Sequence, residues 1–156
     1  MSDWTFEDVE SLSGTAETIA TGLSGVVTVR VMFKDFSTNA ANQALLLQLG
    51  TGGGFVTSGY ICECIATGTM QSITTGFLNV PNTISDAADL HTGIFELILF
   101  GSNKWMCRGT SYENGIAAPR NVAGYISLGG ALTQLRLTTT GGSATFDSGQ
   151  ARAAWK

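Results

Sequence analysis

The chain has 156 residues and three cysteines, and only 13% of its residues are charged, against roughly 25% in ordinary soluble domains. A chain of this length can bury a core without disulfides, so we interpret residues 1–156 as a single domain. The net charge of -4 and the lack of a Lys and Arg cluster disfavour nucleic-acid binding. A surface so poor in charge predicts burial against copies of the chain or within a larger assembly.

The amino-terminal stretch is acidic and lacks a basic segment followed by an apolar run, so no secretory signal is predicted. Trp4 and Phe6 begin an extended segment, which we interpret as a strand although a short helix also fits the spacing. Residues 1–13 are a candidate attachment or interface segment. A short strand at residues 16–20 follows, before a glycine-containing turn.

Residues 25–50 are predicted to be the centre of the fold. Val29, Val31 and Phe33 alternate with polar or flexible residues, as does Val27, which is the two-residue period of a strand with one buried face. After a turn, residues 44–50 form a nearly continuous apolar run, which indicates a more deeply buried strand.

The third strand, residues 59–66, places Tyr60, Cys62 and Cys64 on one face, and Ile61, Glu63 and Ile65 on the other. Cysteines two positions apart in a strand cannot easily bridge each other, so we expect buried, reduced thiols. A metal site that adds Cys107 and His91 has no recognised spacing, and no metal is predicted.

Residues 76–80 form a short strand that Pro81 ends. The loop at 82–89 is predicted to hold one helical turn capped by Ser85. Asp86 and Asp89 alone do not supply the six to eight oxygens that calcium prefers, so a solvated turn is expected.

Residues 92–100 are apolar on both faces. Phe95, Leu97 and Leu99 share one face, while Ile94, Ile98 and Phe100 flank Glu96 on the other. The run is too short to span a bilayer, and we expect no membrane insertion. A strand that is apolar on two faces is typical of burial on both sides, and the second partner can be another subunit.

Residues 104–112 are the expected hairpin partner, with Trp105 and Cys107 inward and Arg108 outward. A tight turn is predicted at 114–115, an irregular segment at 117–121, and further strands at 122–128, 132–140 and from 145 toward the carboxyl terminus. The pattern predicts an all-β protein, an antiparallel, jelly-roll-like β-sandwich of about ten or eleven short strands.

No catalytic constellation is found. His91 is the only histidine, and it lies outside any hydrolase motif. Glu63 and Glu96 would form a glycosidase pair only at a separation of roughly 5 Å, and isolated strand glutamates usually face solvent or pair with arginine. We therefore expect a protein that is not an enzyme and has no cofactor.

Exposed aromatic residues can stack on the apolar faces of sugar rings. A carbohydrate-binding, lectin-like module that recognises host glycans is therefore an alternative, with its contacts in the loops 51–55, 82–89 and 113–120. The candidate glycan-binding residues are Tyr60, Tyr112 and Tyr125.

A series of strand and turn motifs follows in order along most of the chain: residues 14–33, Phe36-Ser37-Thr38-Asn39, Leu47-Gln48-Leu49-Gly50, Thr57-Ser58-Gly59-Tyr60 and Thr75-Gly76-Phe77. In order and spacing, these motifs resemble a module of bacteriophage tail-fibre and related virion surface proteins.

This resemblance implies a structural β-sandwich on the virion surface, synthesised in the cytoplasm of the bacterial host and assembled as a homotrimer. Its partners would be its own copies and other virion proteins, such as the major capsid or tail components, with host glycans as a further partner in attachment. Because no shaft precedes the sandwich, a capsid decoration or short head-fibre protein fits at least as well as a tail fibre. The candidate interface residues are Trp4, Phe6, Ile94, Ile98, Phe100 and Trp155.

Overall fold

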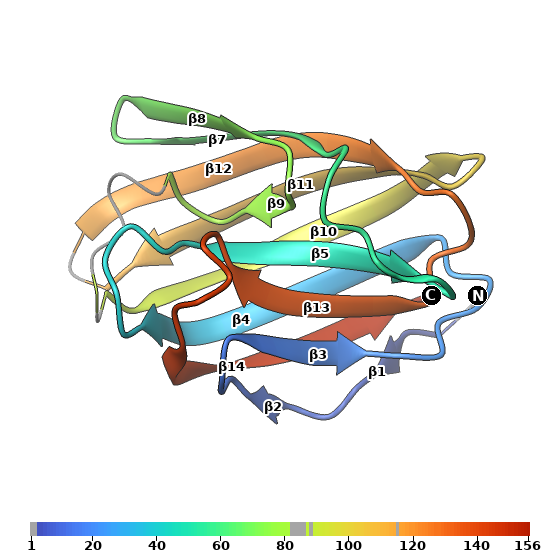
Figure 1. Ribbon diagram of the computed structural model, residues 1–156, viewed down its shortest axis with the longest axis horizontal. Helices are drawn as coiled ribbons and strands as arrows, with labels where there is room; N and C mark the ends of the chain where they lie inside the picture. Colours follow the sequence, from blue (N-terminus) through green and yellow to red (C-terminus); the bar gives the residue numbers. More distant parts are fainter. Residues whose placement is uncertain (1–2, 82–86, 88, 115) are drawn as a thin grey trace.

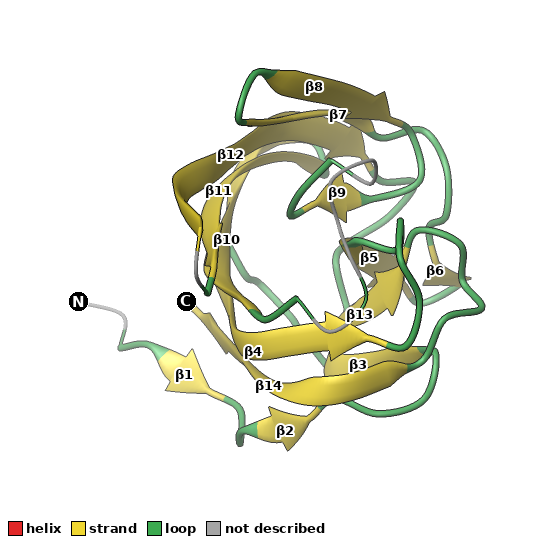
Figure 2. Cartoon of the chain, turned by 90° about the vertical axis from the view of Figure 1, so that its left-hand side faces the viewer, coloured by secondary structure: helices red, strands yellow, loops and turns green. Residues whose placement is uncertain are grey.

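The computed structural model describes residues 3–81, 87, 89–114 and 116–156, and it confirms the predicted all-β class. These residues contain strands and no helix, so none of them forms an apolar helix that could cross a membrane. The strands lie in two antiparallel sheets that face each other as a sandwich. Figure 2 shows the larger sheet curling around the core, while the smaller sheet lies on its open side.

The larger sheet has nine strands. Its centre is an antiparallel meander of three long neighbouring strands, β10, β11 and β12, which run behind the smaller sheet in Figure 1. Across the sheet the order is β1 (Thr5–Phe6), β14 (Phe146–Trp155), β4 (Thr28–Thr38), β10 (His91–Gly101), β11 (Lys104–Glu113), β12 (Ile116–Ser127), β7 (Ile61–Ala66) and β8 (Thr69–Ile73), with β2 (Glu10–Ser11) paired to β14.

The smaller sheet has five strands, and β5 lies at its centre. The order is β3 (Ala16–Ala20), β13 (Gln134–Thr139), β5 (Leu45–Thr51) and β6 (Gly54–Phe55), with β9 (Phe77–Leu78) also paired to β5. The two strands predicted within residues 25–50 therefore belong to different sheets: β4 is internal to one and β5 to the other.

Alternation along the strands builds the core. Val29, Val31 and Phe33 of β4 are buried, and Phe95 and Leu97 of β10 lie beside them in the sheet. All residues of β5 from 45 to 50 are buried, and β9 pairs with Leu46 and Leu47 along one edge of the strand. Val27 differs from its predicted place in this pattern: it precedes β4 and is 50% exposed.

The number of strands differs from the prediction. The described residues form fourteen strands instead of ten or eleven, because short pairings such as β1, β2, β6 and β9 carry too few residues to show a period. The turn between β7 and β8 lies at Thr67 and Gly68, whose positive φ angles of 45° and 80° suit a tight hairpin turn.

The irregular segment predicted at 117–121 is the second correction, since β12 runs through it as a strand. Pro119 has no N–H to donate to a neighbouring strand. However, β7 pairs with β12 only from Asn121 to Tyr125, so the proline lies where β12 has a neighbour on one side alone. The helical turn expected at 82–89 falls mainly outside the described residues.

Candidate functional site: the outer face of the nine-stranded sheet

The outer face of the large sheet gathers most of the predicted interface residues. Because neighbouring strands are in register, outward side chains from β4, β10, β11, β12 and β7 line up in rows across the strands. Three successive rows lie over the middle of the sheet, and the sequence pattern alone does not show which residues share a row.

The first row is apolar and is called the Ile98 row. Ile98 is paired with Met106, Met106 with Tyr125, and Tyr125 with Ile61, so the row crosses four strands. All four side chains are exposed, Ile98 by 44% and Met106 by 49%. Single exposed apolar residues are ordinary, whereas a contiguous row of them marks an interaction surface.

The second row, two residues further along the strands, is charged. Arg30, Glu96 and Arg108 are cross-strand neighbours, and Ala123 and Glu63 continue the row. Glu96 accepts hydrogen bonds from Arg30 Nε at 3.0 Å and from Arg108 Nε at 2.7 Å. The Arg108 hydrogen bond, together with Arg30, lowers the pKa of Glu96 below its usual value. The row carries two positive and two negative side chains and is balanced.

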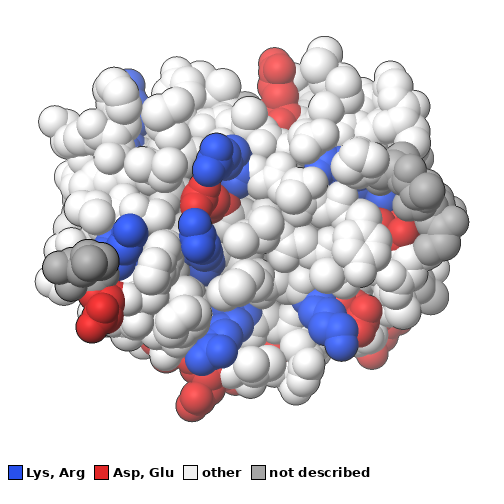
Figure 3. Space-filling model, turned by 180° about the vertical axis from the view of Figure 1, so that it is seen from behind, with Lys and Arg blue, Asp and Glu red and all other residues white. Residues whose placement is uncertain are grey.

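The third row is mixed and is called the Ile94 row. Met32, Ile94, Thr110, Asn121, Ile65 and Met70 follow one another across six strands. Ile65 and Met70 are exposed at one end, while Ile94 is half-buried beside a shallow hollow that it lines with Arg108 and Asn121. The charged row is thus flanked on both sides by apolar side chains. Figure 3 shows the molecule from behind, with scattered charges on a largely uncharged surface.

The amino-terminal segment covers the β14 side of the same sheet. The Arg30 guanidinium lies 4.6 Å from the ring centre of Trp4, and that of Arg152 lies 4.8 Å from the ring centre of Phe6. Trp4 therefore adjoins the charged row through Arg30, while Phe6 is exposed over β14. This arrangement brings two predicted interface residues from residues 1–13 onto the sheet that carries Ile94 and Ile98.

The other two predicted interface residues, Phe100 and Trp155, are not part of the three rows. Phe100 is 74% exposed near the end of β10, beyond the Ile98 row. Trp155 packs against the hydrophobic core, so most of its surface is already used within the chain. Sequence reasoning missed Met106, Ile61, Ile65 and Met70, although the alternation of Ile61 and Ile65 with buried cysteines was a usable signal.

The three candidate glycan-binding tyrosines do not form one site. Tyr60 is only 1% exposed, and its hydroxyl accepts from Leu49 N and donates to Val56 O, so the prediction that it faces a sugar is wrong. Tyr112 and Tyr125 are exposed. Tyr125 pairs with Met106, six residues from Tyr112, which corresponds to about 20 Å along the strand.

The fold does not bring together the residues considered above for catalysis, Glu63 and Glu96, or those considered for metal binding, His91 and the three cysteines. Glu63 and Glu96 lie three strand spacings apart, about 14 Å, which is too far for a pair of glycosidase carboxyls. Cys62, Cys64 and Cys107 are buried free thiols. His91 is opposite Glu113, six residues along β11 from Cys107, so it lies far from the cysteines.

Comparisons with known proteins do not assign the chain to a family. No protein-family model matches the chain, and no curated protein matches it significantly. The outer face of the nine-stranded sheet is therefore the feature from which a function can be inferred.

Proposed function

We propose that this chain is a non-enzymatic structural protein of a bacteriophage virion surface, and that it self-associates through the outer face of the nine-stranded sheet. The observation that carries the self-association is the pair of rows with exposed apolar side chains on either side of a balanced charged row. The virion location, as a capsid decoration, head-fibre or tail-fibre protein, is supported by the sequence resemblance alone.

A second copy of the chain is the occupant that fits this face best. Arg30 lies at one end of the charged row and Glu63 at the other, so a copy in the reversed orientation brings opposite charges together at both ends of the row, while Arg108 at its centre keeps its ion pair with Glu96. Apolar side chains beside the row would lose water on contact, which favours association by about 25 cal/mol per Å². The low charged fraction of 13% agrees with a surface that is covered in the assembly.

Light scattering at micromolar concentration tests the self-association. We expect a mass above that of one 16.3 kDa chain. A copy in the reversed orientation makes a dimer, whereas the trimer that the resemblance implies would need two different patches of each chain in contact. Ile98→Asp should dissociate the oligomer, because a carboxylate would be buried among apolar residues without a partner. The matched control is Val27→Asp: Val27 is similarly exposed at 50%, but it lies at an end of the sandwich among Leu99, Trp105 and Leu132.

Each outcome bears on a separate part of the proposal. A monomeric wild-type protein, or an Ile98→Asp variant with unchanged mass, would remove the interface. A stable dimer would keep the interface and remove the trimer. The virion location is tested by mass spectrometry of purified phage particles from the host that carries the gene, and absence of the protein from them would refute it.

Carbohydrate binding stays as a second candidate, because Tyr112 and Tyr125 both expose ring surface. Tyr125 already has the Lys104 ammonium 5.3 Å from its ring centre, so Tyr112 is the better stacking surface. A glycan array should give signals that Tyr112→Ala abolishes and Tyr60→Phe leaves unchanged. A blank array would count against this function.

A further inference from the structure

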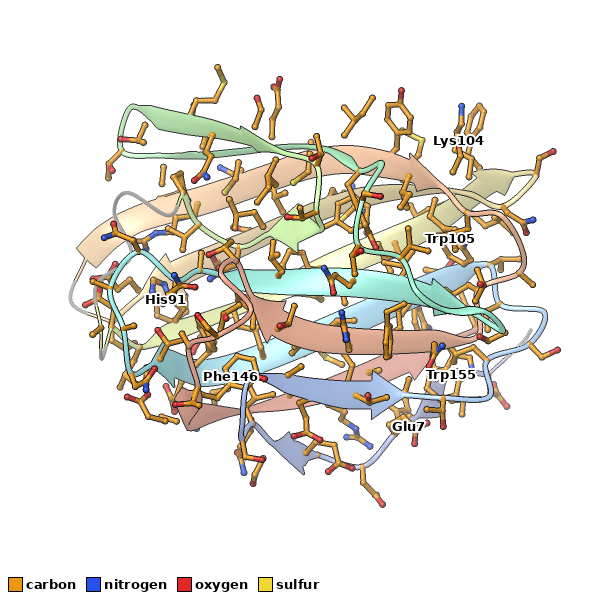
Figure 4. All side chains as sticks on the ribbon, viewed as in Figure 1. Glu7, His91, Lys104, Trp105, Phe146 and Trp155 are labelled. Carbon is orange, nitrogen blue, oxygen red and sulfur yellow. The ribbon has the colours of Figure 1, made fainter. Side chains whose placement is uncertain are left out.

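A polar cluster with no role in the outer face is found where β10 begins. His91, the first residue of β10, is directly opposite Glu113, the last residue of β11, and Asp89 precedes His91 by two positions. One ligand atom from each of these three residues lies within 4.8 Å of the other two. In Figure 4 the imidazole of His91 is seen near one end of the sandwich. The β10 and β11 pairing thus brings a nitrogen donor and two carboxylates to one point.

The imidazole is the unusual member of this cluster. His91 is only 1% exposed, and neither of its ring nitrogens has a hydrogen-bond partner in the described part of the chain. A buried polar group without a partner destabilises a fold, so its presence points to a ligand. Either ring nitrogen of a neutral imidazole can bind a metal.

Arg120 holds Glu113 in place. The two form a buried ion pair between Arg120 Nη2 and Glu113 Oε2, on side chains that are 2% and 7% exposed. Carboxylates that bind metals are commonly oriented by such an outer hydrogen bond. By formal charge, Asp89, Glu113 and Arg120 sum to one net negative charge, which favours a cation at this point.

We propose that Asp89, His91 and Glu113 bind a divalent first-row transition metal, with Zn²⁺ as the best match. One imidazole nitrogen and two carboxylate oxygens are ligands of the type that Zn²⁺ accepts, whereas calcium requires six to eight oxygens. Three protein ligands leave a fourth position for water or an external ligand. The bound metal would join the start of β10 to the end of β11, a role that is independent of the proposed self-association.

Cobalt absorption and thermal unfolding of the full-length protein test this site. After treatment with EDTA and its removal, we expect the wild-type protein to bind a single Co²⁺ with the visible bands of nitrogen and oxygen ligation, and Zn²⁺ to displace it. Zn²⁺ should also raise the melting temperature in proportion to the logarithm of its free concentration. His91→Leu should abolish both effects, and Glu63→Gln, which changes a carboxylate on the outer face, should abolish neither.

His91→Leu is informative because the metal-free variant should fold. It replaces a buried ring that lacks polar partners by an apolar side chain, next to the ring of Phe36 at 6.0 Å, and circular dichroism checks the fold. Absence of Co²⁺ bands in the folded wild-type protein would overturn the site. So would equal Co²⁺ binding by His91→Leu, or an intense thiolate charge-transfer band, which would assign the metal to the cysteines.

Discussion

Ile98 of β10 and Met106 of β11 lie directly opposite each other on the outer face of the nine-stranded sheet, and about half of each side chain is exposed. Cross-strand neighbours of this kind pack on each other and present one continuous apolar surface. Whatever covers Ile98 therefore also covers Met106, which makes the methionine a reporter of assembly.

Met106 is expected to oxidise slowly in the oligomer and rapidly in a monomer. Peroxide converts an accessible methionine thioether into a sulfoxide, and an interface excludes the reagent. Mass spectrometry of peptides after a peroxide pulse should show Met106 oxidation falling several-fold as the wild-type concentration rises. In the Ile98→Asp variant the rate should not depend on concentration. Equal rates in both proteins would mean that Met106 lies outside the contact.

The ion pairs of Glu96 are expected to stabilise the fold in a pH-dependent way. Glu96→Gln leaves Arg30 and Arg108, on the strands to either side, without their shared carboxylate. Because both arginines are well exposed, we expect a loss of about 0.5–1 kcal/mol in the free energy of unfolding at pH 7. Urea unfolding of the two proteins measures it.

The folded-state pKa of Glu96 lies below its usual value of 4.5, so the unfolded chain takes up the proton first as the pH falls. The stabilisation is therefore complete above about pH 4.5 and is lost as the pH falls through the lowered folded-state pKa. The difference between wild type and Glu96→Gln should stay constant from pH 7 to about pH 5 and shrink below pH 4.5. A difference that grew on acidification would contradict this assignment.

The three thiols are expected to be unreactive in the native protein. Burial raises the pKa of Cys62 to about 11 and that of Cys64 to about 12, and it raises the pKa of Cys107 well above its usual value. Only the thiolate attacks disulfide reagents, so at pH 8 labelling should be negligible until denaturant unfolds the chain. Rapid labelling of the folded protein at any one cysteine would show that its strand opens locally.

Gly124 of β12 is expected to tolerate no side chain. A Cβ placed there would collide with the carbonyl oxygen of Ile61 and lie 2.9 Å from Cys62 Cα, both of them backbone atoms of β7. Gly124→Ala should therefore lower the free energy of unfolding by about 1–3 kcal/mol. Gly129→Ala is the matched control, because no atom lies within 4 Å of its Cβ position, and it should change stability by less than about 0.5 kcal/mol.

The sequence determined the fold class and the faces of its long strands. Alternation in residues 29–33 and 95–99, and the apolar run at 44–50, correctly predicted which side chains face the core, although Leu99 is only partly buried. A strand repeats every two residues whatever it pairs with. The same rule placed Trp105 and Cys107 inward and Arg108 outward.

Only the tertiary structure decided which side chains from different strands are neighbours. Register between strands placed Ile98 next to Met106 and Tyr125, brought His91 opposite Glu113, and separated Glu63 from Glu96 by three strands. The inward position of Trp155 likewise depends on neighbours that are distant in the sequence. Periodicity fixes the face on which a side chain lies, whereas pairing between distant segments fixes its neighbours, and a functional site is made of neighbours.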